Sequence, residues 1–178
     1  MRKLIMLFAM LVTLMASAQN TPLSFSDVIQ VEGKTKDEIY GGLREWVATS
    51  YVNGKAVTQM EDQTTGTIIL KAAFPFKKGG IYKAYDGTVR YMLKLQCKDG
   101  RFRAEMNSIT HENKPGHASD CSLGLLTKAA KSGQGGLNKM AHDKIWNELK
   151  AKASEEFRGL TQSLRQITNF SSTTEEDW

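Results

Sequence analysis

Several segments between residues 25 and 106 alternate apolar and polar positions with a period of two, a pattern typical of strands that bury one face. The pattern predicts five strands, at residues 25–32, 56–62, 67–76, 89–97 and 101–106. The alternation is clearest in the fourth, whose expected buried side consists of Val89, Tyr91, Leu93, Leu95 and Cys97. Lys98-Asp99-Gly100 follows, and this composition predicts a hairpin turn into the last strand.

Helical patterns occur on both sides of the strand-rich region. Thr35 and Glu38 have the spacing of a capping box, which predicts that a helix begins there and continues to Asn53-Gly54. Residues 137–167 form one long amphipathic pattern and predict a second helix. Residues 113–136 have little periodicity and are expected to form a long loop with one short helical turn near 123–131.

This order, β-α-β-β-β-β-α, predicts an α+β domain with a five-stranded antiparallel sheet and two helices packed on one face. The other face of the sheet is then open to solvent. The expected core residues are Leu43, Trp46, Leu70, Phe74, Leu93, Leu95, Met106, Ile145, Leu149 and Phe157.

The first residues have the pattern of a secretory signal peptide. Arg2 and Lys3 precede an apolar run of about twelve residues, and Ala16-Ser17-Ala18 matches a cleavage motif. We therefore expect a signal peptide at 1–18 cleaved near Ala18, a single domain at 19–168 and a flexible acidic tail at 169–178. The mature chain is expected to be secreted or periplasmic without a transmembrane anchor.

The opening of the mature domain resembles a family of secreted Bacteroidetes domains of unknown function, which have a fold like the TATA-binding protein (TBP). The resemblance rests on the order of elements, on Trp46 and on the run Val28-Ile29-Gln30-Val31-Glu32-Gly33-Lys34-Thr35-Lys36-Asp37-Glu38-Ile39-Tyr40. It covers about residues 25–110. It implies the fold, and it carries no activity, substrate or site residues.

Charge and motifs narrow the function classes. The formal charge is +5 for all 178 residues and falls to +3 without Arg2 and Lys3, which gives little reason to expect a nucleic-acid partner. The sequence has no nucleophile elbow, P-loop or dinucleotide fingerprint, so no cofactor is expected. We therefore expect a non-enzymatic binding or interaction module whose partner is an envelope protein, a glycan or a lipid head group. An envelope hydrolase and a structural self-associating protein are the alternatives.

Basic residues gather on the polar phase of neighbouring strands. They are expected to share the open face of the sheet and form a ligand-binding patch, against the alternative of a mixed solvated face. These candidate residues are Lys71, Arg90, Lys94, Arg101 and Arg103.

The two cysteines and the histidines are the other candidates for chemistry. A Cys97–Cys121 disulfide would close a loop of about 25 residues and stabilise the fold by about 3 kcal/mol. The alternative is that Cys97 packs in the core as a small apolar residue. His111-Glu112 and His117 lack zinc-protease spacing because Pro115 intervenes, so no metal site is expected and these histidines are expected in an exposed loop. His142 is expected on the polar face of the last helix.

Overall fold

The computed structural model describes residues 21–116, 121–129 and 139–170. Its strands form an antiparallel sheet in the order β1-β5-β4-β3-β2, with the two-residue strand β6 paired to β5. The strands are β1 (Phe25–Gln30), β2 (Thr58–Asp62), β3 (Thr67–Phe76), β4 (Gly87–Lys98), β5 (Arg101–Asn113) and β6 (Gly124–Leu125). The helices are α2 (Lys36–Ser50), α3 (Gly54–Val57), the 3₁₀ helix η1 (Gly80–Tyr85) and α4 (Lys139–Phe170). The predicted α+β class with helices on one side of the sheet is confirmed.

The chain divides into two compact units, and β3, β4, β5 and α4 each contribute residues to both. Of the described residues, unit 1 contains 21–23, 74–90, 108–116, 121–129 and 139–151, and unit 2 contains 24–73, 91–107 and 152–170. The expected core residues are all buried, each at most 7% exposed.

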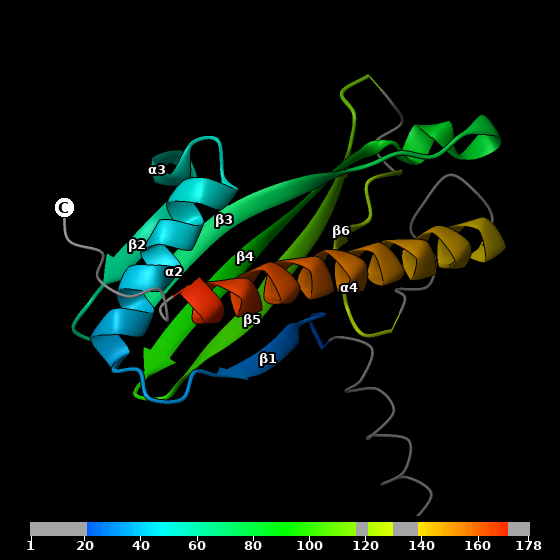
Figure 1. The fold of residues 1–178 in the computed structure, drawn as a ribbon. Helices are drawn as coiled ribbons and strands as arrows, with labels where there is room; N and C mark the ends of the chain where they lie inside the picture. The colour runs from blue at the N-terminus through cyan, green and yellow to red at the C-terminus, as the bar shows by residue number, and fades with distance from the viewer. Residues whose placement is uncertain (1–20, 117–120, 130–138, 171–178) are drawn as a thin grey trace, which may run out of the picture. The chain divides into compact units, whose positions relative to one another are not determined.

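Unit 2 has a layer of helix on sheet. Helix α2 buries Leu43, Trp46 and Val47, and in Figure 1 it lies beside the strands on the same side as the end of α4. The Trp46 indole Nε1 donates to Ser163 Oγ at 2.9 Å, and Phe25 stacks on Phe157 with ring centroids 5.7 Å apart. These contacts join α2, β1 and the end of α4. On the opposite face of the strands of unit 2, Lys71, Arg101 and Arg103 are exposed, so this face is open to solvent there.

Unit 1 is organised around the end of β5. There β6 pairs with β5, and Leu126 N donates to Ile109 O at 2.8 Å. Residues 123–129 therefore contain a strand, so the helical turn predicted near 123–131 is wrong over its described part. The physical reason is that these backbone groups bond to β5 and to residues 21–23, and not to one another as in a helical turn.

Strand β5 continues seven residues beyond the predicted end at residue 106. The buried positions change from even numbers to odd numbers at Ser108, whose φ of 52° is left-handed. An extra residue of this kind, a β-bulge, shifts the alternation by one position without ending the strand. His111 is consequently turned into the core.

Smaller differences concern element boundaries. Residues 54–57 form the helical turn α3, where a strand from 56 was predicted, because the Asn53 side chain accepts from Ala56 N and caps the turn. Helix α4 runs to Phe170 and so includes residues 169 and 170, which were predicted to begin the tail. The predicted signal peptide at 1–18 and residues 171–178 lie outside the described residues.

None of the described helices combines the length and apolar content that a membrane span requires.

Candidate functional site

The five predicted basic residues all lie on the polar side of their strands. Lys71, Arg101 and Arg103 are exposed and Lys94 is partly exposed, all four in unit 2. Arg90 belongs to unit 1, where its guanidinium forms an ion pair with Glu112. Glu112 therefore partly neutralises the charge of Arg90. The candidate basic surface of unit 2 consists of the other four residues.

A hollow of about 330 Å³ lies on unit 2 beside the turn between β4 and β5. We call it the hairpin hollow, and its lining residues are Val28, Thr65, Gln96, Cys97, Lys98, Arg101, Phe102 and Arg103. Within the described part of the chain, Lys98, Arg101 and Arg103 take part in no ion pair. The hollow therefore concentrates three uncompensated positive charges.

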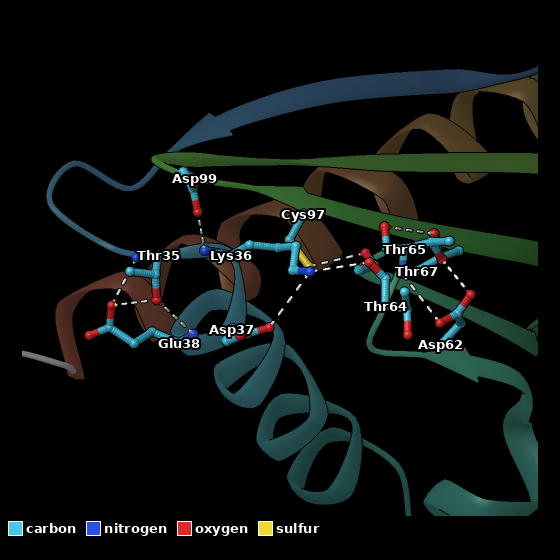
Figure 2. A network of polar contacts seen from close by, with 11 residues as sticks. Thr35, Lys36, Asp37, Glu38, Asp62, Thr64, Thr65, Thr67, Cys97 and Asp99 are labelled. Carbon is cyan, nitrogen blue, oxygen red and sulfur yellow. Dashed lines mark hydrogen bonds and ion pairs between the residues drawn. The ribbon is translucent and has the colours of Figure 1, made fainter.

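The turn that carries Lys98 and Arg101 is held in place by the start of α2 (Figure 2). The Asp99 carboxylate accepts from Lys36 N at 2.7 Å, the first amide of the helix. Gly100 adds two backbone bonds, donating to Lys34 O and accepting from Val31 N, each at 2.8 Å. Because Asp99 is bonded to the helix terminus, its carboxylate satisfies an otherwise orphaned amide.

The same network fixes the turn between β2 and β3, which contributes Thr65 to the hollow. The Lys36 ammonium donates to Thr64 O at 3.1 Å, and the Thr65 hydroxyl donates to Asp62 Oδ2 at 2.8 Å (Figure 2). The hydrogen bonds from Thr65 lower the pKa of the Asp62 carboxyl. Both turns beside the hollow are thus anchored by charge-assisted hydrogen bonds.

Gly66 allows the close approach of this turn to β4. Its φ is +63°, and a Cβ there would lie 2.8 Å from Cys97 O and 3.0 Å from Cys97 Sγ. Cys97 N donates to Gly66 O at 2.8 Å, and the thiol donates to the same oxygen at 3.0 Å. Only glycine fits this backbone conformation without strain, so Gly66 fixes one wall of the hollow.

The capping box predicted from Thr35 and Glu38 is present at the edge of this network. Glu38 N donates to Thr35 Oγ1, and Thr35 N donates to Glu38 Oε2 at 2.8 Å. The backbone and side-chain hydrogen bonds from Thr35, aided by Lys34, lower the pKa of the Glu38 carboxyl to about 2. Glu38 therefore stays charged at neutral pH and supports the helix terminus that holds Asp99.

Sequence reasoning missed Lys98, Gln96, Val28 and Thr65 as lining residues. Lys98 and Gln96 share the even-numbered phase with Lys94, and that signal was available in the sequence. Val28 is 44% exposed and lies opposite Arg103 in the pairing of β1 with β5. Thr65 could not be found in this way, because its place depends on the contact between Gly66 and Cys97.

The cysteines are buried, and neither takes part in a disulfide in the structure. Cys97 lies among the buried residues of β4, as the alternative of a small apolar core residue predicted. Burial raises the pKa of its thiol. The raised pKa disfavours the thiolate, the form that reacts as a nucleophile.

The expectation of exposed histidines is wrong for His111, which is fully buried on β5. Its Nδ1 accepts from Leu123 N at 3.3 Å, and its Nε2 lies 3.1 Å from Tyr85 O, which identifies Nε2 as the protonated nitrogen. Burial lowers the pKa of the ring. His111 thus joins β5 to the segment that follows it within unit 1.

His142 is also buried, 4% exposed, and stacks on Trp146, so its predicted place on a polar face is wrong. Helix α4 buries a wider arc than its apolar stripe suggests. His117 lies outside the described residues. Among the described residues, no three histidine, cysteine or acidic side chains are arranged to hold a metal ion.

A second groove of about 360 Å³ in unit 2 lies between α2 and the end of α4. Its lining includes Trp46, Glu155 and Glu156, and the Tyr91 hydroxyl donates to Glu156 Oε1 at 3.4 Å. Burial raises the pKa of Tyr91 and of Tyr51 beside it. Since both hydroxyls stay protonated, the groove offers polar contacts but no tyrosinate base or nucleophile.

Three comparisons with known proteins bear on the chain. The model of a family described as "Domain of unknown function (DUF4468) with TBP-like fold" matches residues 25–112. No curated protein matches. Two solved structures share the fold, each at 17% sequence identity. A TBP-like protein from Parabacteroides distasonis aligns over 83% of this chain and 95% of its own, with a TM-score of 0.58. A DUF4468 family protein from Bacteroides ovatus aligns over 82% and 87%, with a TM-score of 0.52.

Proposed function

We propose that the chain, which belongs to the DUF4468 family through residues 25–112, is a binding module for an anionic ligand. The family is described by its TBP-like fold and not by an activity. The hairpin hollow is the proposed site. The observation that carries the proposal is the grouping of Lys98, Arg101 and Arg103 around one hollow without an acidic partner among the described residues. Charges arranged in this way attract an anion and give a binding site its specificity.

The proposal extends to location and partners. With the predicted signal peptide removed, the chain acts in the periplasm or outside the cell, and its ligand belongs to the envelope or its surroundings. An acidic glycan, a lipid head group or an acidic envelope protein carries suitable charge. The fixed turns support a rigid site, because Asp99 and Thr65 are held by the network around Lys36 (Figure 2).

The open face lies opposite the core, so its charges can be changed without disturbing folding. Arg101 and Arg103 point away from the buried residues Phe102 and Ala104. Substitutions at such exposed positions usually change the free energy of unfolding by less than about 0.5 kcal/mol. Loss of binding in a charge-reversal variant would therefore report on the site.

The test is a binding screen of residues 19–178 against anionic envelope polysaccharides, anionic lipid vesicles and periplasmic extract. One guanidinium about 4 Å from a unit negative charge contributes about 1 kcal/mol under water-like screening. The variant Arg101→Glu/Arg103→Glu should therefore weaken binding by at least about 2 kcal/mol, or about thirtyfold in Kd. Raising the salt concentration should weaken binding as well, because the Debye length falls below about 10 Å above 0.1 M.

A matched control reverses two exposed charges elsewhere in unit 2. Lys55 on α3 and Arg158 on α4 do not line the hollow. Lys55→Glu/Arg158→Glu changes the net charge by the same amount and should leave Kd within about twofold. Equal losses in both double variants would show that only net charge matters, and binders that ignore Arg101 and Arg103 would refute the site.

A further inference from the structure

The hairpin hollow combines three kinds of chemical group. Lys98, Arg101 and Arg103 supply positive charge, Gln96 and Thr65 supply neutral polar groups, and Val28, which is 44% exposed, supplies an apolar surface. A site for a bare inorganic anion needs only the first kind. The neutral polar groups and the apolar surface indicate a ligand that extends beyond its charged group and carries both hydroxyls and C–H surface.

The arginines suit a carboxylate. Arg101 and Arg103 are two residues apart on β5, so both side chains project from the same face with their Cα atoms about 7 Å apart. A guanidinium binds a carboxylate through two parallel N–H···O bonds, whereas the ammonium of Lys98 acts as a point charge. One arginine can therefore hold the carboxylate while the other two cations add attraction.

The neutral groups suit hydroxyls. The Gln96 amide can both donate and accept. The Thr65 hydroxyl already donates to Asp62 Oδ2 at 2.8 Å, so toward a ligand it offers its lone pairs as acceptors. Val28, 44% exposed and opposite Arg103, offers an apolar surface to the C–H face of a ring.

The size of the hollow agrees with one such ring. Its volume of about 330 Å³ lies at the lower end of the range of pockets that hold small organic ligands. A six-membered ring with hydroxyls and one carboxylate has groups suited to the cations, to Gln96 and Thr65, and to Val28, whereas inorganic phosphate has no apolar surface for Val28. Resting on the function proposed above, we infer that the hairpin hollow binds a carboxylated sugar unit, a hexuronic acid, of an acidic glycan.

The experiment titrates residues 19–178 with an oligogalacturonate, with its carboxyl-reduced neutral counterpart and with inorganic phosphate, by isothermal titration calorimetry. The oligogalacturonate should bind at least tenfold more tightly than either of the others. Arg103→Lys keeps the charge and removes the bidentate geometry, and it should weaken oligogalacturonate binding about fivefold. Gln96→Ala should weaken only the sugar, and Lys55→Glu is the control that should change neither.

The outcomes separate this inference from the proposed function. If phosphate or anionic lipid vesicles bind as tightly as the oligogalacturonate, and Arg101→Glu/Arg103→Glu removes both, the sugar inference is wrong and the anion-binding function stands. If the oligogalacturonate binds but Arg103→Lys and Gln96→Ala leave its Kd unchanged, the inference is also wrong. If none of these anions nor any ligand from the binding screen binds in a manner sensitive to Arg101 and Arg103, the proposed function fails as well.

Discussion

Removing the Asp99 carboxylate should destabilise the domain through the start of α2. Asp99 Oδ1 accepts from Lys36 N at 2.7 Å, and no other described side chain satisfies this first helical amide. Loss of a side chain that caps a helix N-terminus costs about 1 kcal/mol. We expect Asp99→Ala to lower the free energy of unfolding by about 1 kcal/mol, or Tm by about 2–4 °C for a chain of this size.

Urea unfolding followed by circular dichroism measures this change, with two variants for comparison. Asp99→Asn keeps an acceptor oxygen and should lose less than Asp99→Ala. Asp37 lies in the same first turn and only 3.8 Å from the Lys36 ammonium in an exposed pair, so Asp37→Ala should cost less than about 0.5 kcal/mol. An Asp99→Ala loss no larger than that of Asp37→Ala would refute the claim that Asp99 anchors the hairpin turn.

Three further predictions concern the core, the turn and pH. Leu93 is fully buried, so Leu93→Ala should cost about 3–5 kcal/mol in urea unfolding, and a cost below about 1 kcal/mol would contradict its place in the core. Gly66→Ala should destabilise by more than about 1 kcal/mol, because it adds a Cβ against Cys97 at positive φ; an unchanged urea midpoint would argue against that contact. Burial lowers the folded-state pKa of His111 below 6.5, so the unfolded state binds the proton more readily. Stability is then full above pH 6.5 and declines as pH falls below it; His111→Gln should flatten this decline between pH 7 and 5, and an unchanged slope would refute the assignment.

Local patterns predicted the parts of the fold that short-range chemistry determines. The capping box needs only Thr35 and Glu38, which are three residues apart, and the alternation of 89–97 needs only one strand with one buried face. Both are present at the expected residues. The class and the antiparallel sheet follow from such patterns together, because each apolar face must be covered by another element.

The parts that sequence reasoning missed depend on contacts between distant residues or on one backbone angle. The left-handed φ of Ser108 reverses the alternation of β5 and turns His111 inward, and serine itself gives no signal of this. The hollow likewise depends on Gly66 meeting Cys97, 31 positions away, and on Asp99 meeting Lys36. The basic residues were visible in the strand pattern, but the subset that shares a hollow was not.

The most direct test of the proposed site is the mapping of backbone amide shifts by NMR while residues 19–178 are titrated with an oligogalacturonate. Binding at the hairpin hollow predicts the largest shifts in residues 96–103, with smaller ones at Val28 and Thr65. These shifts should disappear in Arg101→Glu/Arg103→Glu and persist in Lys55→Glu/Arg158→Glu. Largest shifts at the groove lined by Trp46 and Glu156, or in residues 121–129, would contradict the account.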